Sequence, residues 1–131
     1  MTISVLVVDD EPDIIELFRQ RFRRELRHGD YALHFAESGE RALELLRKAI
    51  LPEIILILSD INMPGMDGLQ LLQEIKQGWP HLAVMMVTAY GDDDRRRKAA
   101  ETGAVDFLNK PVDFDYLKQR MRALTSLPSA T

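Results

Sequence analysis

The sequence has 131 residues, 46% hydrophobic and 29% charged, which is typical of one soluble globular domain and excludes a disordered or fibrous chain. Its formal net charge of −4 argues against a broad basic surface, so we expect no direct binding of nucleic acid. With no cysteine, disulfides and thiolate metal sites are excluded. The apolar runs are too short to span a membrane, and the acidic start at 9–11 does not resemble a secretory signal, so we expect a cytoplasmic protein.

Five aliphatic runs are predicted to form strands, and a segment with helical spacing follows each of them. The first helix is expected over 12–28, with Pro12 just inside its start and Gly29 at its end. The second begins after Ser38 as N-cap and stops before Pro52. The remaining helices are expected over 69–78, 91–103 and 114–124, and the strands over 3–8, 31–36, 54–58, 82–87 and 104–108.

This alternation of strands and helices indicates parallel strands joined by crossover helices, because a tight hairpin cannot link parallel neighbours. The predicted fold class is a doubly wound α/β sandwich of five strands. The strand over 31–36 contains His34 among its apolar residues, so we place it at an edge of the sheet. One domain is expected over 1–124, followed by a tail or linker over 125–131.

Polar residues follow four of the five predicted strands. In the flavodoxin-like strand order 2-1-3-4-5 those four strands are neighbours, and ligands of such sheets bind beyond the carboxyl ends of the strands. The residues are therefore expected to converge at one end of the sheet; they are Asp9, Asp10, Asp60, Thr88 and Lys110.

Three carboxylates in one crevice would repel one another unless a cation neutralised them. Oxygen ligands without nearby cysteine or histidine favour Mg²⁺ over zinc. In that setting Asp60 is a candidate nucleophile toward phosphorus. Lys110 would then neutralise the transferring group, and Thr88 would donate a hydroxyl hydrogen bond to it.

Four segments of the sequence resemble signatures of the response-regulator receiver family, and the resemblance covers roughly residues 3 to 124; the segments are 5–11, 60–68, 87–89 and 106–111. It implies that Asp9 and Asp10 hold Mg²⁺ together with Asp60 and the backbone carbonyl of Asn62, with Mn²⁺ as a possible substitute. It also implies that Asp60 takes its phosphoryl group from a sensor histidine kinase or a histidine phosphotransfer protein. The Lys110–Pro111 bond is expected to be cis.

The same resemblance assigns a switch role to Thr88 and Phe107, with Thr88 moving toward the phosphoryl group and the ring turning inward behind it. The protein would promote its own phosphorylation and dephosphorylation without being a turnover enzyme on a diffusible substrate. The resemblance also indicates a face for a homodimer or an output domain, formed by the helix over 91–103, the strand over 104–108 and the final helix. The charged run 92–98 lies on that face and includes Arg95, Arg96 and Arg97.

The sequence fits three other functions less well. A phosphohydrolase resembling the haloacid-dehalogenase group would need an acidic residue two positions after Asp60, where this sequence has Asn62. A flavodoxin-like FMN carrier would place a phosphate beside Asp9 and Asp10, which would repel it. A pseudo-receiver that only binds partners has no support in the sequence, because the residues that such a loss would remove are all present.

Overall fold

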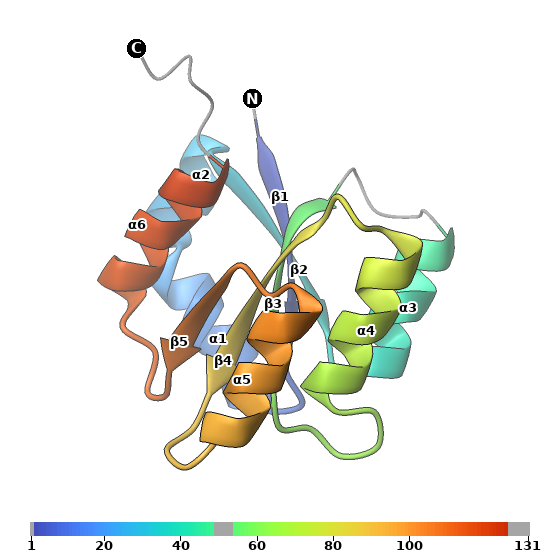
Figure 1. The fold of residues 1–131 in the computed structure, drawn as a ribbon. Helices are drawn as coiled ribbons and strands as arrows, with labels where there is room; N and C mark the ends of the chain where they lie inside the picture. Colours follow the sequence, from blue (N-terminus) through green and yellow to red (C-terminus); the bar gives the residue numbers. More distant parts are fainter. Residues whose placement is uncertain (1, 49–53, 126–131) are drawn as a thin grey trace.

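The computed structural model describes residues 2–48 and 54–125 (Figure 1). Five strands alternate with the helices along the chain, as the sequence predicts. The strands are β1 (Ile3–Val8), β2 (Tyr31–Ala36), β3 (Ile54–Asp60), β4 (Ala83–Thr88) and β5 (Asp106–Asn109). The helices are α1 (Pro12–Arg21), α2 (Arg23–His28), α3 (Gly39–Lys48), α4 (Gly68–Gly78), α5 (Asp93–Thr102) and α6 (Phe114–Thr125).

All neighbouring strands pair in parallel, and their order in the sheet is β2-β1-β3-β4-β5. This confirms the predicted fold class, the predicted strand order and the position of β2 at an edge. The order reverses between β1 and β3, so the carboxyl ends of β1, β3, β4 and β5 lie at a contiguous stretch of one end of the sheet.

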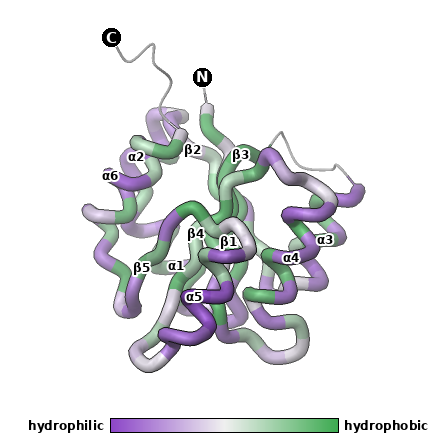
Figure 2. The backbone as a smooth tube through the Cα atoms, in the orientation of Figure 1, coloured by the Kyte–Doolittle hydropathy of each residue, from purple (hydrophilic) through white to green (hydrophobic). Residues whose placement is uncertain are grey.

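Helices cover both faces of the sheet (Figure 1). Apolar residues of α1, α2 and α6 pack on one face, and those of α3, α4 and α5 pack on the other. Because β1, β3 and β4 are buried on both faces, their side chains are almost continuously apolar, which Figure 2 shows as green strands inside more polar helices. Within the described residues, no helix has the length and apolar character needed to cross a membrane.

The single helix predicted over 12–28 was wrong, because the structure breaks it at Phe22. This residue has φ −102° and ψ 13°, outside the helical region, and separates α1 from α2. Its side chain is fully buried, with its ring packed against those of Phe18, Tyr31 and Phe114. Burial of this aromatic ring offsets the loss of helical geometry at one residue. The predicted end of the segment is confirmed by Gly29, which adopts a left-handed conformation at φ 78°.

Other element boundaries follow local hydrogen bonds. Ser38 caps α3 as predicted, since its Oγ accepts from the Arg41 N–H at 3.0 Å. Helix α5 begins at Asp93, later than expected, and ends before Gly103 as predicted. Strand β5 covers Asp106–Asn109 instead of 104–108, in register with β4. The predicted stop before Pro52 and most of the predicted tail, 126–131, lie outside the described residues, and Thr125 belongs to α6.

Candidate functional site

The carboxyl ends of the strands bring predicted polar residues together at one end of the sheet. Asp60 and Thr88 are the last residues of β3 and β4, so they are held by the sheet hydrogen bonds themselves. Asp9 directly follows β1, and Lys110 directly follows β5. The Lys110–Pro111 bond is cis, as predicted. Asp9, Asp60 and Thr88 are buried and Lys110 is partly buried, which places charged groups where water screens them little.

Both carboxylate oxygens of Asp60 accept hydrogen bonds. Lys110 Nζ donates to Oδ2 at 2.7 Å, and the backbone N–H of Asn62 donates to Oδ1 at 3.0 Å. Only 2% of Asp60 is exposed, so these two donors replace most of the water that would otherwise solvate its charge. The two hydrogen bonds fix the orientation of the Asp60 carboxylate, and the Asp9 carboxylate lies beside it.

Lys110 is held in its charged form by the carboxylates around it. Desolvation lowers the pKa of Lys110, but the hydrogen bond to Asp60 and the charges of Asp60, Asp9 and Glu11 outweigh it, so the pKa lies above its ordinary value. Its Nζ is also 4.0 Å from Oε1 of Glu11. The Lys110 backbone N–H donates to the carbonyl of Thr88 at 2.8 Å, which joins the loop after β5 to the end of β4.

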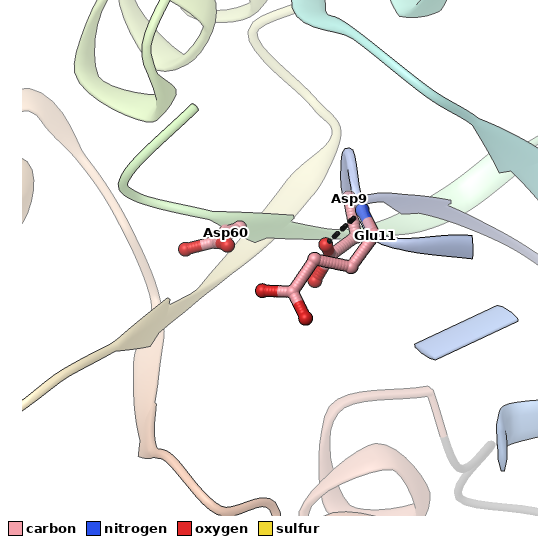
Figure 3. Close-up of side chains that lie close together, drawn as sticks. All are labelled: Asp9, Glu11 and Asp60. Atoms are coloured by element: carbon pink, nitrogen blue, oxygen red, sulfur yellow. Dashed lines mark hydrogen bonds between the residues drawn. The ribbon is translucent and has the colours of Figure 1, made fainter. Parts of the chain in front are cut away.

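Three carboxylate groups could hold a metal ion, namely Asp9, Glu11 and Asp60, which each offer an oxygen within 4.8 Å of the others (Figure 3). Asp9 Oδ1 accepts from the Glu11 backbone N–H at 2.9 Å, the bond drawn in Figure 3. Burial raises the pKa of Asp9 to about 6; the hydrogen bond from Glu11 opposes this shift and the charge of Asp60 adds to it. Two buried carboxylates and one exposed carboxylate are hard oxygen donors that repel one another, and they fit Mg²⁺, which would relieve the repulsion.

Glu11 is a site residue that sequence reasoning missed. Asp10, the expected ligand, is exposed and lies outside the carboxylate group, so its role as a ligand stays a prediction. Asp9 and Glu11 instead lie within reach of Asp60 and of each other. The signal that could have indicated Glu11 is the acidic run 9–11, which places a third carboxylate shortly after the end of β1.

The two predicted switch residues make their side-chain contacts with residues other than Asp60. The Thr88 hydroxyl donates to the Leu108 carbonyl at 3.3 Å and to Asn109 Oδ1 at 3.2 Å, both on β5. Phe107 is half-buried, and the Arg96 guanidinium lies 4.8 Å from the centre of its ring. Contact with this arginine from α5 was not predicted.

An apolar cleft opens beside the charged residues. Its volume is about 410 Å³, and it lies between α1, the sheet and the start of α6. Asp9, Glu11 and Lys110 line its polar end, and the rest of its lining includes Ile14, Leu58, Val112 and Phe114. An apolar side chain of another molecule could therefore enter the cleft next to Lys110, the residue that donates to Asp60.

Comparison with known proteins assigns this arrangement to a family. The family model described as "Response regulator receiver domain" matches residues 5–122. The chain is 42% identical over 111 residues to the DNA-binding transcriptional regulator NtrC of Escherichia coli, covering 85% of this chain and 22% of that protein. It is 39% identical over 113 residues to the response regulator protein FleR of Pseudomonas aeruginosa, covering 86% of this chain and 22% of the relative. The chain thus spans about a quarter or less of the curated relatives it matches.

Solved structures of receiver domains have the same fold as this chain. The receiver domain of NtrX from Brucella abortus superposes with a TM-score of 0.78 at 32% identity, covering 94% of this chain and 99% of that one. A response regulator receiver domain protein from Clostridium thermocellum gives a TM-score of 0.83 at 28% identity, with 93% of both chains covered. The chain belongs to the response regulator receiver domain family, the signalling domains of two-component systems.

Proposed function

We propose that this receiver domain is a phosphorylation-dependent switch in which Asp60 accepts a phosphoryl group in the presence of Mg²⁺. The observation that carries the proposal is the buried Asp60 carboxylate, 2.7 Å from the Lys110 ammonium and beside the carboxylates of Asp9 and Glu11. Such a group is shielded from water, oriented by two donors and adjacent to a cation site. Those are the conditions that a carboxylate nucleophile needs for attack on phosphorus.

The reaction would transfer the phosphoryl group from a phosphohistidine. A carboxylate oxygen of Asp60 forms the new O–P bond as the N–P bond of the donor imidazole breaks, and the leaving nitrogen keeps the bonding electrons and is protonated. Lys110 would stabilise the negative charge on the phosphoryl oxygens. A bound Mg²⁺ would neutralise charge on the carboxylates and on the phosphoryl group. We propose Asp9, Asp10, Asp60 and the Asn62 carbonyl as its ligands, with Glu11 nearby and Mn²⁺ as a substitute.

Thr88 would then change partners. Its hydroxyl would leave the Leu108 and Asn109 oxygens and donate to a phosphoryl oxygen, and Phe107 would turn inward, away from the Arg96 guanidinium. Moving a two-state equilibrium from 1:99 to 99:1 takes about 5.5 kcal/mol. Hydrogen bonds to charged groups contribute roughly 1.5–3 kcal/mol each. Two or three such bonds, made only in the phosphorylated state by Thr88, Lys110 and a backbone N–H, are sufficient.

We propose two partner surfaces. The apolar cleft beside Lys110 would receive the sensor kinase or phosphotransfer protein, because it gives a partner's apolar residues access to the edge of the site. The face formed by α5, β5 and α6 would carry the output, as a homodimer or through an output domain. This is the face predicted from the sequence; its two helices are α5 and α6 here because the first predicted helix is split in two. The switch would act in the cytoplasm and would also catalyse loss of its own phosphoryl group.

Acetyl phosphate tests the proposal directly. Wild type, Asp60→Asn and the control Asp94→Asn would be incubated with acetyl phosphate, with and without Mg²⁺, and their intact masses measured. We expect a Mg²⁺-dependent phosphoryl adduct on wild type and on Asp94→Asn, since Asp94 is an exposed residue of α5, and none on Asp60→Asn. An adduct on Asp60→Asn, or none on wild type despite Mg²⁺ binding, would reject Asp60 as the acceptor.

A further inference from the structure

The side chain of Asn62 is held at both of its ends by residues from the start of α5. Its Nδ2 donates to Asp92 Oδ2 at 2.8 Å, and its Oδ1 accepts from the Arg95 guanidinium. Arg95 also forms an ion pair of 2.7 Å with Asp67, the residue that caps α4. These polar contacts tie the loop after Asp60 to the starts of α4 and α5.

Asp92 makes a second contact with the phosphoryl site. The same Oδ2 accepts the backbone N–H of Ala89 at 2.8 Å. Ala89 directly follows Thr88, whose hydroxyl also donates away from Asp60. Two donors that could turn toward a phosphoryl group on Asp60 are therefore occupied by other acceptors.

Asp92 occupies the N-cap position of α5 without capping the helix. A carboxylate at that position usually accepts a backbone N–H of the first turn, which stabilises the helix. Here Asp92 makes no side-chain cap hydrogen bond. Its carboxylate binds Asn62 and Ala89, which lie before the helix, so its contacts connect the acceptor loop instead of stabilising α5.

Helix α5 has little apolar contact to keep it in place. Ala99 is its only buried residue, and the rest of the helix is strongly polar. Elements with few buried apolar contacts are the ones that move at low free-energy cost. Polar contacts at the start of α5 therefore contribute a large share of what holds this helix in its present position.

We propose that Asp92 and Arg95 form a latch that restrains the segment after Thr88 in the unphosphorylated state and so opposes binding of a phosphoryl group at Asp60. Both are positioning residues, since neither has to touch the phosphoryl group. The inference rests on the proposed function. Phosphoryl binding that frees the Ala89 N–H must break the contacts of Asp92 and Arg95. The free energy of these contacts therefore makes the binding of the phosphoryl group less favourable.

Beryllofluoride, a stable mimic of the phosphoryl group, tests the latch in the presence of Mg²⁺. Its affinity would be measured by titration, with the amide NMR signals of Thr88 and Ala89 as the readout, for Asp92→Ala and Arg95→Ala. We expect about tenfold tighter binding for Asp92→Ala and about threefold for Arg95→Ala. Combining both changes should give less than the product of the two effects, because both act through Asn62.

Charge alone predicts a different pattern. Removing the negative Asp92 would favour an anion, whereas removing the positive Arg95 would disfavour it, so tighter binding in both variants is specific to the latch. The matched controls are Asp94→Ala and Arg97→Ala, which remove the same charges from the same helix. Among the residues that the structure describes, Asp94 and Arg97 pair only with each other, at 3.5 Å, and they are 86% and 70% exposed, so affinity should stay within about twofold of wild type.

Two results would overturn the inference. Unchanged or weaker binding in Asp92→Ala and Arg95→Ala, with wild-type thermal stability, would mean that these residues do not oppose phosphoryl binding. Failure of wild type to bind beryllofluoride or to form an adduct with acetyl phosphate would reject the proposed function itself, and the latch with it.

Discussion

The ammonium of Lys110 lies 2.7 Å from Oδ2 of Asp60, although 50 positions separate the two residues along the chain. The carboxylate is 2% exposed, while 29% of the lysine side chain reaches solvent. The pair therefore joins a buried anion to a cation that remains accessible from the mouth of the site. An incoming phosphoryl group would meet the lysine before it meets the carboxylate.

Removal of the lysine charge should destabilise the domain and slow its phosphorylation. In Lys110→Met the Asp60 carboxylate keeps its burial but loses its charged donor, so we expect the free energy of unfolding at neutral pH to fall by about 1–3 kcal/mol. Urea denaturation measures this change, and the mass of the acetyl phosphate product measures the adduct. Lys98→Met, at an exposed position of α5, serves as the control.

The double variant Lys110→Met with Asp60→Asn tests whether Asp60 is the group that Lys110 stabilises. If Asp60 is the group that Lys110 stabilises, the lysine change should destabilise the Asp60→Asn protein much less than it destabilises wild type. Equal losses in both backgrounds would show that Lys110 contributes through packing instead.

Acid should stabilise the metal-free protein through Asp9. Burial raises the pKa of this carboxyl group to about 6, above its ordinary value of 3.8, so between these values the folded state binds a proton that the unfolded state does not. The free energy of unfolding contributed by Asp9 therefore rises as pH falls from about 7 toward about 4. Mg²⁺ needs the ionised carboxylate, so its affinity should fall over the same range.

Urea denaturation without Mg²⁺ at several pH values checks this direction in wild type and in Asp9→Asn. The variant should lose the Asp9 contribution, so the difference between the two proteins should change with pH. A constant difference across the range would contradict the raised pKa.

Gly68 is required beside the acceptor. A Cβ atom there would lie 2.4 Å from the carbonyl oxygen of Asp60 and 2.6 Å from the Cα of Ile61, both backbone atoms that cannot move independently. Gly68→Ala should therefore destabilise the fold by more than about 3 kcal/mol or displace the Asp60 loop. At Gly78, the last residue of the same helix, a Cβ meets nothing within 4 Å, so Gly78→Ala should be neutral or slightly stabilising.

Denaturation curves of the two alanine variants provide the comparison. Similar stability of Gly68→Ala and Gly78→Ala would mean that the close approach of α4 to Asp60 is not maintained in solution.

Sequence patterns predicted the fold well where apolar residues recur at regular spacing. The buried strands β1, β3 and β4 are aliphatic runs, and the mixed composition of β2 correctly indicated an edge. The break at Phe22 could not be seen in advance, because apolar spacing continues through it and neither glycine nor proline marks it. It depends on the tertiary packing of its ring against Tyr31 and Phe114.

The candidate site was predictable where its residues lie at the ends of strands, and not where its side chains meet between loops. Residues at the ends of strands were found because strand order brings them together. The contacts of Asn62 with Asp92 and Arg95 join exposed polar side chains 30 and 33 positions apart, and no periodicity records such pairs. Surface hydrogen bonds between loops follow from how the helices dock, which a pattern of apolar residues leaves unspecified.

Asp10 and Glu11 compete for the role of metal ligand, and one matched pair of variants separates them. The structure groups Glu11 with Asp9 and Asp60, whereas the family resemblance implies Asp10. Glu11 is 60% exposed, lies 4.0 Å from the Lys110 ammonium and would lose more side-chain freedom on ligation than a short aspartate would. Among the described residues Asp10 forms no side-chain hydrogen bond or ion pair, so it can turn toward an ion without breaking a contact.

Asp10→Asn and Glu11→Gln each remove one negative charge and nearly preserve side-chain size. We expect Asp10→Asn to weaken Mg²⁺ binding about tenfold or more, through loss of a direct ligand, and Glu11→Gln about threefold, through loss of a neighbouring charge. Titration of Mg²⁺ followed by amide NMR measures both. The reverse order of effects would place Glu11 in the coordination sphere instead of Asp10, and equal small effects would leave Asp9 and Asp60 as the carboxylates that hold the ion.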